Sequence, residues 1–505
     1  MQKKPIRNFV VVGGGSAGWM TAAALAKVLG QQSYSVTLVE SDLIGIVGVG
    51  EATIPMIQMY NTTLGIDENE FVRETNATFK LGIEFVDWRN LGQKYFHPFG
   101  MYGVDMDGIN FMHFWMRWTR SGGGSTEIAR FNAETEAAKV GKFMRTMDPQ
   151  PQLPRVNYAF QFDASRYAAY LRRFAEARGC QRIEGQIVKV HQNAESGFIE
   201  KLELKDGCMV EGDFFIDCSG FRGLLIEDTY KAGYEDWSQW LPVNRAAAMP
   251  CALDGPPVPY TRATAREAGW QWRIPLQHRI GNGYVFCNEF ISEDEAMAKL
   301  SSRLDGQKLA DPRLLKFVTG TRRKAWMKNC VAIGLSSGFL EPLESTSIHL
   351  GQVGISKLLA YLPGEITDSL IDKYNREMHH EYSSVRDFII AHYKVTERED
   401  TPFWRRCKYM DIPDTLKAKL ELFRTRGEVH PNSNELFKET SWFAVLCGQG
   451  MVPEAYHPIA DVISDDELKL RLSRIRTGVA ERVNGMPAHH DFIAKNCRSP
   501  QSETV

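Results

Sequence analysis

The chain has 505 residues, of which 43% are hydrophobic and 24% are charged. This composition predicts a globular protein that buries a large core, as one composite domain or as roughly two or three closely packed ones. Its 60 Lys and Arg against 62 Asp and Glu give a formal net charge of -2, and no long run of one sign indicates a nucleic-acid or membrane partner.

The nine cysteines include no CxxC pair, which argues against a disulfide framework and against a zinc site. We therefore expect no metal and a reducing, cytoplasmic setting. Basic residues near the N-terminus precede an apolar stretch as in a secretion signal, but glycines interrupt that stretch. Nowhere else does the sequence offer the roughly 18 uninterrupted apolar residues of a membrane-spanning helix.

The first 40 residues predict a βαβ unit. Residues 8–12 are an apolar run typical of a buried strand, residues 13–18 a tight turn, residues 19–29 a helix and residues 35–40 the next strand. Further strands are expected at 187–190, 199–204, 214–217 and 330–334, and from about residue 367 the apolar spacing becomes helical.

The turn of this unit carries the pattern Gly13-x-Gly15-x-x-Gly18 between a strand and a helix, the context of a dinucleotide site. Gly13 permits the turn, Gly15 lets the backbone approach a pyrophosphate, and Gly18 lets helix and strand pack closely. Ser16 and Ala17 open the helix, whose amino terminus faces the negative charge.

Other residues bear on which nucleotide is bound, because the glycine pattern alone does not choose between FAD and NAD. Glu40, at the end of the second strand, is placed to accept hydrogen bonds from the adenosine ribose. The run 217–220 after a strand favours FAD by analogy with flavin hydroxylases. Those enzymes usually carry Gly-Asp after the third strand, whereas Gly334 is followed by Leu335, so a different flavin chemistry is expected.

Four segments in order along the chain, GGGSAGWM at 13–20, GVGEATIP at 48–55, WQWRIP at 270–275 and EPLESTS at 341–347, resemble the flavin-dependent tryptophan halogenase family. The resemblance implies an enzyme that uses reduced FAD from a separate flavin reductase, dioxygen, and chloride or bromide. It would make hypohalous acid that halogenates an electron-rich aromatic such as an indole. A homodimer stays open.

The implied fold is α/β, an FAD-binding Rossmann-like fold of the flavin monooxygenase type. We expect the FAD module to be assembled from about residues 1–90, 165–225 and 325–365. Insertions at about 90–165 and 225–325 would form a β-rich substrate layer, and residues 366–505 a mainly helical region that completes the substrate site.

Lys80 and Glu344 match the catalytic residues of the family. Lys80 lies in an expected continuous strand over 78–85, in which the alternate apolar residues share the opposite face; by itself such a lysine would be solvated. The resemblance implies that it meets hypohalous acid and delivers it, by hydrogen bonding or as a haloamine. Glu344, just before an expected helix, would polarise the oxidant or take the proton from the ring carbon.

The two tryptophans of WQWRIP stand two apart, so on a strand both indoles project from one face. In the family, such a wall at Trp270 and Trp272 is held to exclude the organic substrate from the flavin. The start of the helix after Glu344 also offers backbone amides at Thr346 and Ser347 for a halide. The family commonly has Gly where this chain has Ser347.

The resemblance assigns further contacts. Cofactor contacts fall on Gly50 and Glu51, in a strap at 48–51 that links the flavin and substrate sites, on Val188, and on the backbone of Leu335 and Ile348. His97 and Phe99 match positions that sandwich the substrate, and Trp442 or Phe443 could supply the opposite wall.

Free tryptophan is doubtful as the substrate, because the paired tyrosines and the glutamate that clamp the amino acid in tryptophan-specific members are not found in the carboxy-terminal half. Bare indole or another aromatic fits at least as well. Two alternatives stay open: an aromatic hydroxylase that inserts oxygen directly, and a non-catalytic flavin-binding protein.

Overall fold

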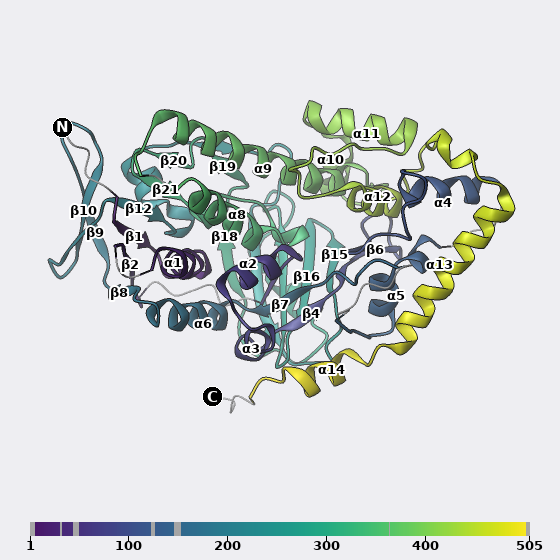
Figure 1. The fold of residues 1–505 in the computed structure, drawn as a ribbon, viewed down its shortest axis with the longest axis horizontal. Helices are drawn as coiled ribbons and strands as arrows, with labels where there is room; N and C mark the ends of the chain where they lie inside the picture. Colours follow the sequence, from purple (N-terminus) through teal and green to yellow (C-terminus); the bar gives the residue numbers. More distant parts are fainter. Residues whose placement is uncertain are drawn as a thin grey trace.

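A six-stranded sheet assembled from distant parts of the chain lies at the N-terminal side of the molecule (Figure 1). The computed structural model describes residues 6–30, 33–43, 50–122, 127–145, 153–362 and 364–500. The strand order is β20-β21-β12-β1-β2-β8, parallel except for the β20–β21 pair. The strands are β1 (Asn8–Val12), β2 (Ser35–Glu40), β8 (Gln181–Glu184), β12 (Phe214–Asp217), β20 (Trp326–Met327) and β21 (Cys330–Ala332).

The turn between β1 and α1 (Ser16–Leu29) depends on glycine. Gly13 has φ +110°, and a Cβ there would lie 2.3 Å from the carbonyl oxygen of Cys218 in the turn after β12. Only a residue without a side chain tolerates both conditions. The alanine-rich face of α1 is buried against α6 (Ala164–Glu176) and α8 (Ser347–Ala360), which brings three distant segments to one end of the sheet.

A seven-stranded sheet forms the second layer, in the order β18-β14-β17-β16-β15-β5-β6. Its pairs are antiparallel except for β15 with β5. The strands are β5 (Gly82–Val86), β6 (Lys94–Pro98), β14 (Arg245–Cys251), β15 (Thr261–Arg266), β16 (Gly269–Pro275), β17 (Ile280–Phe286) and β18 (Arg313–Lys316). β17 is buried on both faces, so this sheet lies inside the molecule.

Three smaller sheets complete the β structure. They are β3 (Gly50–Ala52), β7 (Ala159–Asp163) and β4 (Thr78–Lys80); β9 (Ile187–Gln192), β10 (Ile199–Leu204) and β11 (Met209–Glu211); and β13 (Tyr234–Asp236), β19 (Gly320–Arg322) and β22 (Gly338–Phe339).

Helices cover the sheets and make up most of the chain after residue 346 (Figure 1). The others are α2 (Met56–Leu64), α3 (Glu68–Glu74), α4 (Phe111–Arg120), α5 (Ala133–Lys139), α7 (Glu293–Ser302), α9 (Asp368–Lys394), α10 (Pro402–Tyr409), α11 (Asp414–Arg426), α12 (Glu439–Gly448), α13 (Asp465–Gly485) and α14 (His489–Asn496). The short turns are η1 (Ile128–Phe131), η2 (Gly220–Arg222), η3 (Leu224–Thr229), η4 (Gly334–Ser336), η5 (Pro342–Glu344) and η6 (Pro458–Asp461). In the described residues no helix is both long and apolar enough to cross a bilayer.

This architecture confirms the expected α/β fold with a β-rich layer and a helical carboxy-terminal region. The segment 225–325 supplies β13 to β19, whereas the described part of the segment 90–165 supplies β6 and β7 together with α4, η1, α5 and loops. Whether the segments fold as separate units stays a prediction.

The continuous strand expected over residues 78–85 is wrong. The chain breaks at Leu81, whose backbone bonds to Pro259 and Phe99, and it changes sheets there, from β4 to β5. Gly82 permits the change, because a Cβ at this residue would lie 2.3 Å from the carbonyl oxygen of His97. Lys80 therefore ends a strand instead of facing solvent from the middle of one.

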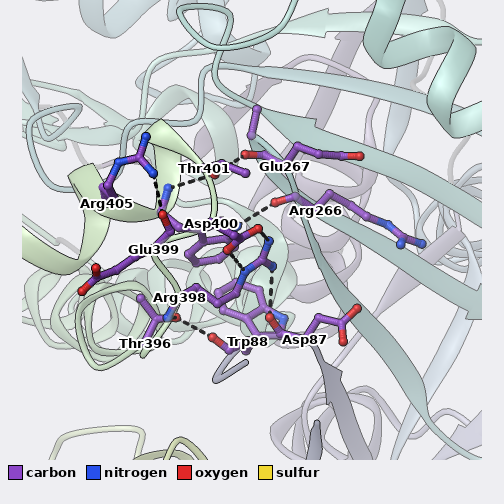
Figure 2. A network of polar contacts seen from close by, with 12 residues as sticks. Asp87, Trp88, Arg266, Glu267, Thr396, Arg398, Glu399, Asp400, Thr401 and Arg405 are labelled. Atoms are coloured by element: carbon purple, nitrogen blue, oxygen red, sulfur yellow. Dashed lines mark hydrogen bonds and ion pairs between the residues drawn. The ribbon is translucent and has the colours of Figure 1, made fainter. Parts of the chain in front are cut away.

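The loop after α9 ties the end of that helix to the seven-stranded sheet, as Figure 2 shows. Thr396 Oγ1 donates to the carbonyl of Trp88 at 2.6 Å, and Arg398 Nη1 donates to that of Asp87 at 3.0 Å. Thr401 Oγ1 donates to the carbonyl of Glu267, in the turn between β15 and β16, at 2.8 Å. The C-terminal end of α9 is thereby held beside β16.

We expect Gly13→Ala to lower the free energy of unfolding by about 2 kcal/mol or more, because the new methyl group meets backbone and φ is left-handed. Gly15→Ala is the matched control, since a Cβ there meets nothing within 4 Å; the change should cost less than about 1 kcal/mol at this N-cap. Urea denaturation of the three proteins measures the difference, and equal losses in both variants would contradict the role given to Gly13.

Candidate functional site

A cavity of about 450 Å³ opens between the six-stranded sheet and the seven-stranded sheet. Twelve of the residues assigned to cofactor, halide or wall roles from the sequence line it, namely Gly13, Gly15, Ser16, Ala17, Glu40, Gly50, Glu51, Trp270, Trp272, Leu335, Ser347 and Ile348. The cavity volume lies in the range of ligand sites, and three segments far apart in sequence meet there.

Three assigned residues do not line the cavity. Gly18 packs against the turn instead, where a Cβ would lie 1.8 Å from the carbonyl oxygen of Gly13. Val188 is 55% exposed on β9 while its neighbour Ile187 lines the cavity, and Thr346 lies behind the cavity wall. A cofactor contact through Val188 stays a prediction. Of the strap, Gly48 and Val49 lie outside the described residues.

The lining fits a dinucleotide. The amino terminus of α1 opens into the cavity beside Gly15, and Glu40 stands at the end of β2, where a ribose would lie. The carboxylate of Glu40 is oriented by Arg182, whose Nε donates to Oε1 at 2.5 Å. A Cβ on Gly14 would lie 1.4 Å from Glu40 Oε2, so a larger residue there would displace this carboxylate.

Glu51 adds a second carboxyl to the cavity. Burial raises its pKa to about 7, so near neutral pH it can both donate and accept a hydrogen bond. This carboxyl could therefore form hydrogen bonds with a bound ring system. From the sequence pattern alone, Glu51 could not be told apart from an ordinary surface glutamate.

Trp270 and Trp272 project from β16 into the far side of the cavity, with ring centroids 6.2 Å apart. The Trp272 ring lies over Gly283 of β17, where a Cβ would be 2.0 Å from the indole. Both rings are buried, and Trp270 Nε1 donates to Glu341 Oε2 at 2.9 Å. The two indoles thus form a wall with a fixed position.

Lys80 is completely buried at the end of β4. Its Nζ donates to Ser345 Oγ at 2.7 Å and to the carbonyl of Thr53 at 3.1 Å, and it lies 5.1 Å from the centroid of the Phe99 ring. Burial lowers the pKa of Lys80 to about 7, against the attraction of Glu344. Near neutral pH the amine can therefore both donate and accept a proton.

Glu344 is also completely buried, at the end of η5. His97 Nδ1 lies 2.9 Å from Oε2, and His392 Nε2 lies 2.8 Å from Oε1. Burial alone would raise the pKa of Glu344, but the attraction of His97 and the contacts with His392 lower it to about 2. The group is therefore a carboxylate held between two imidazoles.

The contacts of His392 orient its ring. Its Nδ1 is 2.9 Å from the carbonyl oxygen of Phe388, which can only accept, so Nδ1 carries a proton. Its Nε2 lies 2.8 Å from Glu344 Oε1, so the ring is held between the backbone of its own helix and the carboxylate.

Aromatic rings surround His97 on the side away from the cavity. Phe388 and Phe437 stack with centroids 3.8 Å apart, at 5.7 Å and 6.2 Å from the His97 ring. Trp442 meets Phe388 edge-on at 4.9 Å. Phe443 turns the other way, toward Trp115 and Phe423, so of the two residues assigned to the opposite wall only Trp442 joins this aromatic cluster.

The amino terminus of α8 lies next to both catalytic candidates. Thr346 caps the helix and Ser347 begins it, directly after Ser345, which has φ +59°. Thr346 Oγ1 is buried without a hydrogen-bond partner among the described residues. A free hydroxyl and the helix amino terminus together make this position suitable for an anion.

Strand β4 is supported from the far end of the chain. The backbone N–H of Phe79 donates to His489 Nε2 at 3.1 Å, and His489 Nδ1 donates to the carbonyl of Pro257 at 2.7 Å. Burial lowers the pKa of His489 to about 4, so the ring stays neutral and accepts the bond. Helix α14 therefore helps to hold the strand that ends in Lys80.

Sequence reasoning did not single out His392, Phe388, Phe437 or Glu341. His392 stands in the last turn of α9, where a basic residue is common for the helix dipole alone. For Glu341, the sequence offered one indication, which is that the segment EPLESTS contains a second glutamate besides Glu344. In the described part of the chain no cluster of His, Cys, Asp and Glu is placed to hold a metal ion.

Comparisons with known proteins agree with this geometry. The sequence profile described as tryptophan halogenase matches residues 8–465. A flavin-dependent halogenase from Xanthomonas campestris has 47% identity and a TM-score of 0.95, covering 99% of this chain and 100% of that one. A second one, from Brevundimonas sp. BAL3, has 44% identity and a TM-score of 0.94 over 98% and 99% of the two chains. A tryptophan 6-halogenase from Streptomyces albogriseolus is 34% identical over 97% of this chain and 98% of its own.

The buried amine makes stability depend on pH. Between pH 7 and the ordinary Lys pKa of 10.5, Lys80 binds a proton in the unfolded chain but not in the folded one, so the wild type gains stability as pH rises. Lys80→Met stays neutral at every pH. Its stability relative to the wild type should therefore be most favourable near pH 6 and fall by up to about 4 kcal/mol toward pH 10.

Urea denaturation of both proteins at several pH values measures this difference, in which all other titrating groups cancel. A difference that does not change with pH would contradict the lowered pKa of Lys80.

Proposed function

Because the chain belongs to the tryptophan halogenase family, we propose that it halogenates indole or a related electron-rich aromatic with chloride or bromide, using dioxygen and reduced FAD from a separate flavin reductase. The observation that carries this proposal is a buried amine, Lys80, and a buried carboxylate, Glu344, that both adjoin Ser345, a residue of the same cavity that Trp270 and Trp272 line. Direct oxygenation needs an open path from flavin to substrate, and the wall argues against one.

The cofactor would bind with its pyrophosphate at Gly13 and Gly15 and its ribose at Glu40, the groups that line the cavity. When bound, reduced FAD supplies the two electrons with which dioxygen is activated to oxidise a halide. The backbone of Leu335 and Ile348 and the carboxyl of Glu51 are candidates for contacts with the ring system. The halide would lie at the amino terminus of α8, near Thr346 and Ser347.

Lys80 would bind hypohalous acid. Its ammonium form donates a hydrogen bond to the oxygen, so the halogen faces the substrate, and hydroxide leaves as water when the proton follows. Ser345 and the carbonyl of Thr53 hold Nζ in place. A pKa near 7 suits a group that gives up and regains a proton in each turnover.

Glu344 would take the proton that the ring carbon loses after the halogen has added. As a carboxylate it also stabilises the positive charge that develops on the ring before this step. His97 and His392 keep it ionised and oriented. The proton taken from the ring then passes from Glu344 back to Lys80, which replaces the proton that Lys80 gave to the leaving oxygen.

The aromatic cluster of His97, Phe388, Phe437 and Trp442 favours a flat, apolar ring as substrate. The charged groups that touch it are already paired: Glu344 with the two histidines, and Lys419, which lies over the Trp442 ring, with Glu435. Free tryptophan would bring an ammonium and a carboxylate group into this region, where no unpaired charge among the described residues is available to bind them. Indole is therefore the better candidate for the substrate. The proposed reaction would take place in the cytoplasm, where the flavin reductase would also be found.

Lys80→Ala should lower indole halogenation by about 100-fold or more, because it removes the group that binds and protonates the oxidant. Flavin oxidation should stay within about twofold of the wild type, since the change lies outside the flavin cavity. Product is measured by mass spectrometry with a supplied reductase. Lys94→Ala, an exposed lysine of the neighbouring sheet, is the control; halogenation as fast as wild type in Lys80→Ala would refute the lysine's role.

Indole should be halogenated with a kcat/KM about tenfold or more above that of free tryptophan, because the site leaves the ammonium and carboxylate of the amino acid unpaired. Both substrates are offered separately with chloride or bromide, and isotope patterns identify the halogen. A preference for tryptophan, or oxygenated product in halide-free buffer, would contradict the proposal.

A further inference from the structure

Glu341 is a second buried carboxyl on the segment that carries Glu344, and the proposed chemistry does not use it. It is completely buried, and its Oε2 accepts two hydrogen bonds, from Trp270 Nε1 at 2.9 Å and from the Tyr393 hydroxyl at 2.9 Å. Its Oε1 is buried and has no hydrogen-bond partner among the described residues. A buried carboxyl with one idle oxygen is costly, so the two bonds it makes call for an explanation.

The two donors lie on different layers of the molecule. Trp270 belongs to β16 and forms half of the wall, whereas Tyr393 belongs to the last turn of α9. The residue before Tyr393 is His392, which contacts Glu344. Two consecutive residues of one helix thus hold the two carboxyls of one short segment.

The end of α9 is itself fixed. Tyr393 packs against Trp88 at 5.3 Å and stacks on Trp404 at 5.9 Å, and the loop that follows is bonded to the backbone of Trp88 and Glu267 (Figure 2). Arg398 in that loop lies 4.6 Å over the Trp404 ring. Glu341 therefore connects a rigid helix end to the Trp270 indole.

We propose that Glu341 is a positioning residue that fixes the Trp270 indole in the wall between cofactor and aromatic substrate and couples it to the segment bearing Glu344. The effect of Glu341 on halogenation rests on the proposed function, whereas its contact with Trp270 does not. If the indole is released, the wall loosens, and oxidising equivalents made at the flavin escape without reaching Lys80. The number of halogenated products per reduced flavin consumed then falls.

Burial raises the pKa of Glu341 to about 7, against the bonds from Trp270 and Tyr393. Near neutral pH a neutral side chain can therefore stand in for it, and the amide of Gln keeps an oxygen that accepts from Trp270. Glu341→Gln should act as the conservative rescue. Glu341→Ala removes the acceptor, and Glu341→Asp withdraws it by one methylene.

The first test follows the indole itself. The eleven tryptophans are replaced by 5-fluorotryptophan, and the fluorine resonance missing from Trp270→Phe is assigned to Trp270. We expect this resonance to move and broaden in Glu341→Ala and Glu341→Asp and to return in Glu341→Gln, with no cofactor or substrate added. Glu381→Gln is the control, because this buried carboxyl lies on α9 about 18 Å along the helix from Tyr393. An unchanged resonance in both Glu341→Ala and Glu341→Asp would overturn the inference.

The second test measures halogenated indole per reduced flavin consumed, with a supplied reductase. Glu341→Ala and Glu341→Asp should lower this ratio about tenfold, the effect of one lost hydrogen bond on a buried carboxyl, and Glu341→Gln should stay within about twofold. Glu341→Ala combined with Trp270→Phe should be no worse than Trp270→Phe alone, because both remove the same bond. Effects that multiply would overturn the coupling.

The two proposals fail in different ways. A wild type that halogenates no arene refutes the proposed function, and the fluorine resonance still decides whether Glu341 positions Trp270. If Glu341→Ala does not fold, Glu341→Asp carries both measurements, since it keeps the carboxyl and changes only its reach.

Discussion

The ionised carboxylate of Glu344, buried between His97 and His392, is the interaction on which the rest of the site depends. A carboxylate taken out of water costs several kcal/mol unless opposite charge and hydrogen bonds compensate. The compensation comes from β6 on one side and from the end of α9 on the other. The two elements are nearly 300 residues apart, so the layers must pack correctly before this charge can be tolerated.

The cavity and the region of Lys80 and Glu344 differ in their surroundings. The cavity at the six-stranded sheet is lined by glycine turns and helix ends, whereas the Lys80 and Glu344 side is lined by aromatic rings. The two indoles of β16 line the cavity and are held by Gly283 and Glu341. Under the proposed function, the two indoles would keep the organic substrate away from the cofactor while a small oxidant passes.

Sequence patterns predicted the βαβ unit and most strands, because apolar runs and the glycine turn are local signals. The resemblance predicted Lys80 and Glu344 as a pair, which no spacing could show across 263 intervening positions. Sequence patterns failed to predict features that depend on contacts between distant parts of the chain. The chain changes sheets at Leu81 because Gly82 permits a close approach to β6, and His392 looks like an ordinary helix-terminal base. Trp442 and Phe443, adjacent in sequence, face different clusters because they lie on one helix, where neighbours diverge.

The bond from the Phe79 backbone to His489 has a consequence for the order of folding. β4 pairs with β7 on one edge only, and its other edge receives this bond from a helix near the end of the chain. During synthesis the strand bearing Lys80 therefore waits for more than 400 further residues before its surroundings are complete. A chain that ends before α14 lacks the acceptor for the Phe79 N–H, so the support of the strand that ends in Lys80 is completed only when this helix has been made.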